Sequence, residues 1–201
     1  MPINPASFDS PTASLAYAWG KPLATGRLRQ HPEDFQVTEI PLLEPDGAGE
    51  HVWLWIRKCN ENTHDVAGQL ARFAGVHPRQ VSFAGLKDRK AVTEQWFSVQ
   101  LPGKHEPHWE DMGSDTLTVL RHARHSRKLR RGTLKGNAFR ITVRDIDGGR
   151  DELEQRLAVI AREGVPNYFG EQRFGRDGST LQTADRLFSK PRLRLSRNKR
   201  S

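Results

Sequence analysis

Hydrophobic and polar residues alternate along several short segments of this 201-residue chain. Such alternation is typical of β-strands, in which successive side chains point to opposite faces of a sheet. In the segment HVWLWIRK, aliphatic residues alternate with two tryptophans, which predicts a strand with an aromatic second face. The strand predicted to begin at residue 139 would be half-buried, with arginines on its outer face. The pattern predicts strands at residues 35–40, 51–58, 81–84, 93–101, 117–120 and 139–144.

Two other segments have the spacing of amphipathic helices. Apolar residues recur at helical spacing from His64 to about Ala74, directly after Thr63, a residue type that suits the N-cap. A second helix is predicted for residues 151–163, where an acidic first turn suits the helix dipole and Gly164 suits the C-terminal cap. Several strands with a few interspersed helices predict an α+β protein.

Composition and the chain start exclude several classes of protein. The longest apolar runs are far shorter than the ~20 residues that a membrane-spanning helix needs. Residues 1–20 lack the basic start and the apolar block of a secretory signal. Cys59 is the only cysteine, which excludes an internal disulfide and a cysteine-built zinc site. We therefore expect a cytoplasmic protein without a membrane segment.

The chain has a formal net charge of +8, and its cations are unevenly distributed. Residues 116–144 contain no acidic residue but nine lysines and arginines, and residues 190–201 carry six more. This concentration favours a polyanionic partner, because each neutralised phosphate releases condensed counterions. A solvated basic face without a partner is the alternative.

The sequence gives little support for a metal site, a phosphate-binding loop or a serine or cysteine nucleophile. The histidine pairs at 105/108 and 122/125 have a spacing that would chelate a metal on a helix, but no third ligand accompanies them, so we expect no metal site. The glycines at 47 and 49 lack the lysine and the following helix of a phosphate-binding loop. No local motif supports a serine or cysteine nucleophile.

A polar hinge, LKDRK at residues 86–90, separates two of the predicted strands. It places one carboxylate, that of Asp88, among the cations Lys87, Arg89 and Lys90. Opposite charges close to a carboxylate favour its ionised form. The hinge is therefore either a solvated surface turn or an anion held ready beside an anionic substrate.

Four sequence blocks resemble those of one enzyme family. The block SFAGLKDRKAVTEQW, around Asp88, resembles the motif of the catalytic aspartate in the TruD family of tRNA pseudouridine synthases. HPEDFQVTEI precedes it, and RHSRKLRRGTLKGNAF and GVPNYFGEQRFG follow it, in the order that the family has. Because four ordered blocks are spread from about Arg27 to Gly178, the resemblance is specific, whereas a lone GLKD would carry little weight.

The resemblance implies an enzyme that isomerises uridine to pseudouridine in transfer RNA, at position 13 if the family's specificity applies. Asp88 matches the catalytic aspartate, which attacks the target nucleotide so that the uracil detaches, rotates and rejoins the ribose through carbon. No cofactor is implied, because the reaction is an isomerisation. The implied fold is the mixed, largely antiparallel sheet of pseudouridine synthases with flanking helices. Transfer RNA is the implied partner, and no protein partner is inferred.

Further site residues follow from the same blocks. Phe35 and Asn137 match positions that contact the target nucleotide, and Phe139 matches an aromatic residue that packs in the site. Arg29 occupies the place of a lysine in the family and keeps its positive charge. These residue types fit the chemistry, since a uridine must leave its stack before a side chain can reach it.

Lys87, Arg89 and Lys90 would help to hold the Asp88 carboxylate ionised if they turn towards it, and the same cations would draw in substrate phosphates. Each assignment also has a structural alternative. An aspartate in a turn is ordinary turn chemistry, as is a Gly-Asn pair such as 136–137. The phenylalanines at 35 and 139 alternate as core residues do. Arg173 either binds RNA or pairs with Glu171.

Family members are longer than this chain, with a catalytic domain that is interrupted by an inserted domain and completed by a C-terminal segment. The resemblance implies that residues 1–163 are the N-terminal part of the catalytic domain and that residues 164–201 begin the inserted domain. The chain would then be truncated, and its sheet incomplete, at the C-terminus. We therefore expect weak or no activity from this chain alone. The alternative function is a basic RNA-binding module without catalysis.

Overall fold

The computed structural model describes residues 16–103, 106–167 and 179–189. The chain divides into two compact units, one comprising Thr25–Asp147 and the other Met1–Ala24 together with Gly148–Ser201. The predicted division into catalytic and inserted domains after residue 163 is not tested by these units and stays a prediction. None of the described helices is both long and apolar enough to cross a membrane.

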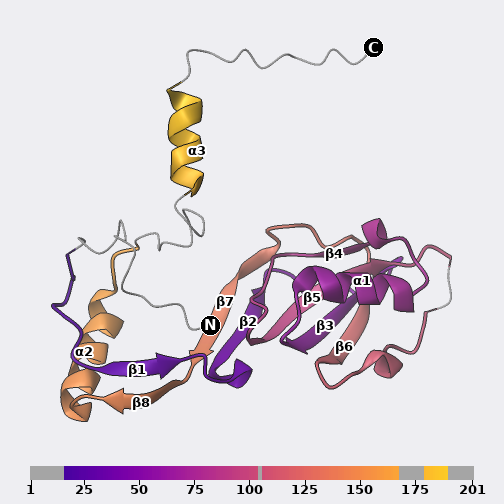
Figure 1. Ribbon diagram of the computed structural model, residues 1–201. Helices are drawn as coiled ribbons and strands as arrows, with labels where there is room; N and C mark the ends of the chain where they lie inside the picture. The colour runs from indigo at the N-terminus through magenta and orange to yellow at the C-terminus, as the bar shows by residue number, and fades with distance from the viewer. Residues whose placement is uncertain (1–15, 104–105, 168–178, 190–201) are drawn as a thin grey trace. The chain divides into compact units, whose positions relative to one another are not determined.

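The unit Thr25–Asp147 is built on a six-stranded mixed sheet (Figure 1). Only β2 and β5 run parallel, and every other pairing in this sheet is antiparallel. The prediction of an α+β fold with a mixed, largely antiparallel sheet is therefore confirmed. The strand order is β6 (Leu117–His125), β3 (His51–Cys59), β5 (Val92–Gln100), β2 (Phe35–Pro41) and β7 (Leu134–Ile141), with β4 (Val81–Phe83) also paired to β5.

One edge of β5 is shared by two strands. The residue pairs between β2 and β5 involve residues 92–94 of β5, whereas those between β4 and β5 involve residues 97–99. At the break, the backbone N–H of Trp96 donates to the Glu39 side chain, with N and Oε1 3.3 Å apart. The loop that leaves β4 and enters β5, residues 84–91, begins beside this break.

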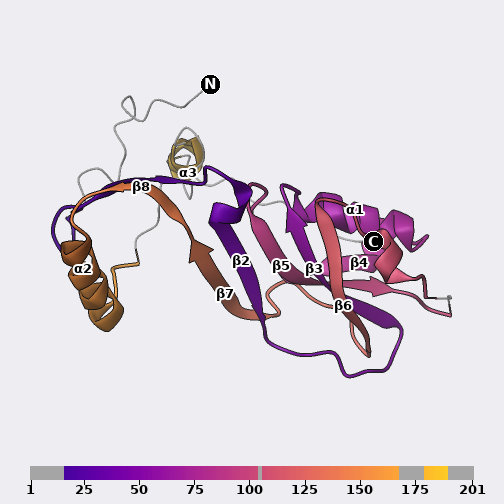
Figure 2. The ribbon, with the colours of Figure 1, turned by 90° about the horizontal axis from the view of Figure 1, so that it is seen from below.

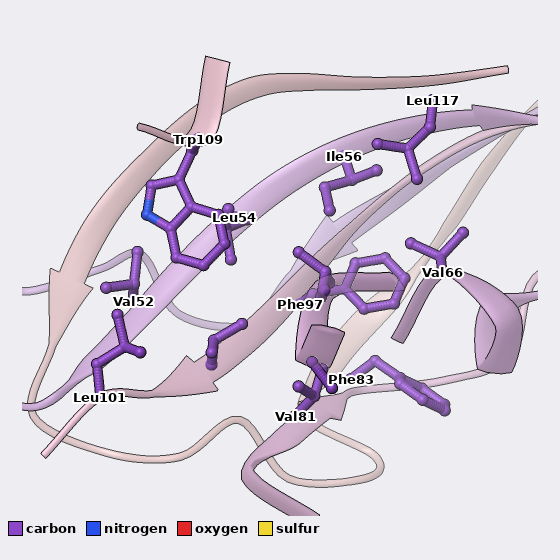
Figure 3. Packing of buried hydrophobic residues seen from close by; sticks show 13 residues of the cluster. Val52, Leu54, Ile56, Val66, Val81, Phe83, Phe97, Leu101, Trp109 and Leu117 are labelled. Carbon is purple, nitrogen blue, oxygen red and sulfur yellow. The ribbon is translucent and has the colours of Figure 1, made fainter. Parts of the chain in front are cut away.

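Strand β3 is buried on both faces, which explains its apolar run. Val52, Leu54 and Ile56 point into a core that also contains residues of helix α1 (Thr63–Phe73), as Figure 3 shows for Val66. The tryptophans Trp53 and Trp55 belong to a second cluster with Trp96, Leu129 and Ala84. Figures 1 and 2 both show α1 over one face of the sheet. The predicted aromatic second face of β3 is confirmed.

Three local predictions need correction. Asn62, not Thr63, is the N-cap of α1, because Thr63 lies inside the first turn and its hydroxyl bonds elsewhere. Strand β6 continues to His125, because it pairs with β3 as far as His51, so it extends beyond the strand predicted at residues 117–120. The segment expected as one half-buried strand is β7 followed by β8 (Val143–Asp147). Phe139 is 58% exposed, and β7 lies at one edge of this sheet.

Several elements had no clear sequence pattern. Strand β1 (Thr25–Leu28) pairs with β8 in a separate two-stranded sheet. Three short 3-10 helices lie at Pro32–Asp34, Pro78–Gln80 and Trp109–Met112. In the other unit, α2 (Arg150–Glu163) is the predicted second helix, and Gly164 follows it with a φ of 77°. Helix α3 (Ser179–Phe188) was not predicted.

Asp34 is buried in the turn before β2. Its two carboxylate oxygens accept hydrogen bonds from Arg144 at 2.7–3.0 Å, and one oxygen also accepts the backbone N–H of His31. The Arg144 guanidinium lowers the pKa of the Asp34 carboxyl to about 2. These bonds join the segment before β2 to the start of β8.

We predict that this carboxylate stabilises the fold above pH 4 and ceases to do so near pH 2. The folded-state pKa lies below the usual 3.8, so the stabilisation is complete above the usual value and disappears as the pH falls through about 2. Asp34→Asn should therefore be less stable than the parent at pH 6, and the difference should shrink between pH 4 and pH 2. Urea unfolding followed by tryptophan fluorescence measures it. A difference that did not depend on pH would contradict the assignment.

Candidate active site

The backbone of the loop between β4 and β5 is held by hydrogen bonds on both sides of Asp88 and at Asp88 itself. The Gly85 carbonyl accepts from Gln95 Nε2 at 2.9 Å, and the Lys87 N–H donates to Thr63 Oγ1 at 3.0 Å. The Asp88 carbonyl accepts from Lys58 Nζ at 2.8 Å. These bonds hold the backbone of the loop, while the side chain of Asp88 remains 44% exposed.

The Asp88 carboxylate faces a cation from another part of the chain. Arg29 Nη1 lies 3.7 Å from Asp88 Oδ1. The Arg29 guanidinium also lies over the ring of Phe35, with its carbon 3.8 Å from the ring centroid. Phe35 in turn meets Phe139 edge to face, with the ring centroids 6.0 Å apart. The structure thus brings together four of the six residues that the sequence singled out.

Arg29 has a backbone φ of 55°, in the left-handed region that residues with a side chain seldom adopt. Such a conformation costs of order 1 kcal/mol and persists only where the surrounding structure holds it. Strained positions cluster at functional sites, and this one lies between β1 and the turn that contains Asp34.

Asn137 belongs to the same face as the two phenylalanines. In the antiparallel pairing of β2 with β7, Asn137 is opposite Glu39 and Phe139 is opposite Val37. Directly paired residues share a face of a sheet, and alternate residues along a strand do so as well. Phe35, Asn137 and Phe139 therefore line one face, on which Asn137 and Phe139 are exposed.

Lys87 does not face the Asp88 carboxylate as the hinge suggested. Its Nζ lies 2.8 Å from Glu39 Oε2, and the two side chains are only 2% and 1% exposed. The Arg89 Nε donates instead to the Asn60 carbonyl at 3.3 Å. Among the described residues, the cation that pairs with Asp88 is Arg29. A substrate contact by Lys87 would require this buried ion pair to open.

Two of the residues that hold the Asp88 loop, Glu39 and Lys58, were not singled out in the sequence analysis. The alternation of inward and outward positions along their strands offered a signal for both. Glu39 follows Phe35 and Val37 at a spacing of two, so it falls on their face of β2. Lys58 continues the inward positions Val52, Leu54 and Ile56 of β3, and it is fully buried. A charged residue at an inward strand position needs a partner, and here the partners hold the loop.

The Lys58 amine donates to the carbonyls of Glu61 and Asp88, both at 2.8 Å. Burial lowers its pKa to about 8, against the opposing effect of the negative charges of Asp88 and Glu61. At neutral pH the amine therefore keeps its charge and can make both bonds.

The remaining candidates from the sequence are the histidine pairs and Arg173, and none of them is seen in contact with the residues of this site in the part of the chain that the structure describes. His122 lies 3.9 Å from Glu110, and His125 lies 3.1 Å from Asp46. Within the described ranges, no group of three or more His, Cys, Asp or Glu residues could hold a metal ion. His105 and Arg173 lie outside the described residues.

We predict that breaking the buried Glu39–Lys87 pair destabilises the fold strongly. Lys87→Met leaves an unpaired buried carboxylate, which typically costs about 3–5 kcal/mol. The double variant Lys87→Met/Glu39→Gln should recover much of this, because a neutral amide can still accept the Trp96 N–H. Urea unfolding provides the free energies.

The matched control is the Arg57–Glu94 pair on the same sheet, also at 2.8 Å but with Arg57 52% exposed. Arg57→Met should cost less than about 1 kcal/mol, because exposed ion pairs contribute little. Equal losses for Lys87→Met and Arg57→Met would show that the buried pair has no special role.

We predict that Lys58 makes the fold more stable as the pH rises above 8. The folded-state pKa of about 8 lies below the usual 10.5, so between these values the unfolded chain binds the extra proton. The stability of the parent relative to Lys58→Met should therefore increase from pH 8 to pH 10.5. Urea unfolding across this range tests the sign, and a decrease would refute it. NMR titration of the ¹³C-labelled lysine gives the pKa directly.

Comparisons with known proteins agree on one family. A family model described as tRNA pseudouridine synthase D (TruD) matches residues 13–186. The chain is 57% identical over 187 residues to a tRNA pseudouridine synthase D of Methylococcus capsulatus, covering 93% of this chain and 53% of that protein. It thus spans about half the length of this curated relative.

A solved structure is similar as well. The crystal structure of the putative tRNA pseudouridine synthase D (TruD) from Methanosarcina mazei matches with a TM-score of 0.66 and 33% sequence identity. The match covers 81% of this chain and 41% of that one. It supports the α+β fold over the matched part.

Proposed function

The chain belongs to the TruD family of tRNA pseudouridine synthases, and we propose that it forms the part of such an enzyme that attacks uridine-13 of transfer RNA through Asp88. The observation that carries the proposal is the cluster of Asp88, Arg29, Phe35 and Phe139. It combines an exposed carboxylate, a cation and two aromatic rings.

Each component suits one requirement of the reaction. Pseudouridine formation breaks the bond between N1 and the ribose and forms a bond between C5 and the ribose. The proton on C5 is released and N1 takes one up, so the product is an isomer and no oxidant or reductant is consumed. The Asp88 carboxylate is the nucleophile that splits this exchange into two easier steps.

Arg29 is proposed to hold the Asp88 carboxylate in place through their ion pair. The guanidinium lies within 3.7 Å of the carboxylate and is itself placed by the Phe35 ring. Arg29 would also lie where the negatively charged RNA approaches.

The aromatic pair and Asn137 are proposed to receive the target base. A base that has left its stack can be held against aromatic rings and recognised by hydrogen bonds at its edge. Phe139 is exposed for such stacking, and an asparagine amide offers both donors and an acceptor. Their shared face with Phe35 supports the assignment.

We predict that Asp88→Asn abolishes pseudouridine formation but preserves RNA binding. Removing a nucleophile should reduce turnover by at least about a thousandfold. Binding should stay equal or become tighter, because a negative charge is lost. The assay uses unmodified transfer RNA, with a second transfer RNA that carries cytidine at position 13.

The matched control is Asp145→Asn, because Asp145 is also exposed and lies 3.5 Å from an arginine, Arg27. Since the chain spans about half of its relative, each variant is tested alone and in a hybrid. In the hybrid, this chain replaces the segment of the Methylococcus capsulatus protein that it matches. In whichever form the Asp145→Asn control is active, equal turnover by Asp88→Asn would refute the nucleophile. Product from the cytidine-13 transfer RNA would refute the position.

A non-catalytic RNA-binding module is the second candidate, favoured by the basic segment alone. Asp88→Asn separates the two, because a simple binder has no turnover to lose. A hybrid without activity whose chain still binds RNA would support the second candidate.

A further inference from the structure

We propose that residues 126–133, here called the basic loop, form a preorganised surface that binds the phosphate backbone of RNA outside the Asp88 site. The choice of RNA as the partner rests on the proposed function. Three observations support the surface itself: its cations have no described acidic partner, its backbone is anchored, and its cations line two cavities.

Ion pairing divides the nine cations of residues 116–144 into two groups. Arg121, Arg124 and Arg144 pair with Glu44, Glu106 and Asp34, at 3.1, 2.7 and 2.7 Å. The other six have no described acidic side chain within the 4.0 Å of an ion pair. A cation that is not neutralised within its own fold keeps its charge for an external anion. These six are Arg127, Lys128, Arg130, Arg131, Lys135 and Arg140, and four of them belong to the basic loop.

The backbone of the basic loop is anchored at its centre and at both ends. Leu129 is 1% exposed and lies in the tryptophan cluster. Its N–H donates to Ser98 Oγ at 3.1 Å, and its carbonyl accepts from Ser82 Oγ at 2.7 Å. The Ser126 N–H donates to the Asp46 carboxylate, and the Gly132 N–H donates to the Ala84 carbonyl. Little backbone entropy therefore remains to be lost when a ligand binds.

The cations of the loop border two cavities. Arg127, Lys128 and Arg130 help to line one of about 520 Å³. Arg131 lines another of about 280 Å³ together with His64. The Arg131 guanidinium lies 4.8 Å from the centroid of the Phe83 ring, which positions it over this second hollow.

The chemistry of these side chains suits the phosphates of an RNA backbone. Arginine presents a planar fork of donors that matches the oxygens of a phosphate. The tryptophans beneath the loop are buried, so they offer no platform for base stacking. Contacts from this surface would therefore go to the backbone, position the RNA and carry little sequence preference.

The basic loop is also connected to the proposed nucleophile. Ala84, which accepts the Gly132 N–H at 2.8 Å, is the first residue of the loop that contains Asp88. RNA held by the basic loop would thus be bound next to the segment that presents the carboxylate.

The test compares two triple variants that each remove three positive charges. The loop variant is Arg127→Gln/Arg130→Gln/Arg131→Gln. The control variant is Arg57→Gln/Arg121→Gln/Arg124→Gln, whose arginines are ion-paired in the fold. Binding of unmodified transfer RNA is measured by fluorescence anisotropy from 50 to 200 mM salt. Tryptophan fluorescence confirms that both variants are folded.

A plot of the logarithm of the association constant against the logarithm of the salt concentration has a negative slope. We expect this slope to be less steep by about 2–3 in the loop variant, since each phosphate contact contributes about 0.7–0.9. The parent should then lose about 20- to 40-fold more affinity than the loop variant across this salt range. The control variant should change the slope by less than about 1. Equal changes in both variants would mean that only net charge matters and would overturn the proposal, as would an unchanged slope in the loop variant.

This result is independent of catalysis. Asp88→Asn should leave the salt slope as it is, so a chain that behaves as expected here but forms no pseudouridine would refute only the proposed function. A catalytically active chain with equal slopes would refute only the basic loop.

Discussion

The carboxylate of Glu39 bonds to β5 in the gap between the two strands that share one edge of β5. Along one edge of β5, β2 pairs with residues 92–94 and β4 with residues 97–99, and the Trp96 N–H falls between them. Glu39 Oε1 accepts that N–H, and Oε2 pairs with Lys87. A buried N–H needs a partner, and a buried carboxylate needs a cation, so each bond requires the next. Because Lys87 directly precedes Asp88, these bonds also set the position of the proposed nucleophile.

The same constraint explains why the cation beside Asp88 comes from a distant part of the chain. Lys87 is committed to Glu39 and Lys58 to two carbonyls, so the neighbouring lysines stabilise the backbone of the loop. The carboxylate is left to Arg29, which reaches it from the end of β1. This division allows a loop with several cations to be rigid and yet present an exposed acid.

Sequence reasoning succeeded where one local pattern determined the outcome. The alternation in β2 and β3 and the helical spacing in α1 were sufficient, because each of these elements has a face that must be buried. The residues around Asp88 were found through a resemblance rather than through periodicity. The direction of the Lys87 side chain could not be predicted, because adjacency in sequence says nothing about a partner such as Glu39, 48 residues away. The exposure of β7 was missed for a related reason, since alternation does not reveal whether another element covers a face of the strand.

The difference between local sequence pattern and long-range contact matters most for the charged residues. A count of nine cations in residues 116–144 treats them alike, but the fold neutralises some and leaves others free of a described acidic partner. Arg144 is the clearest case, because it satisfies the buried Asp34 and is therefore part of the fold. Arg131, only thirteen positions earlier, lies instead over Phe83 beside a hollow. Residues of one type in one basic segment thus serve either stability or binding, and long-range acidic partners decide which.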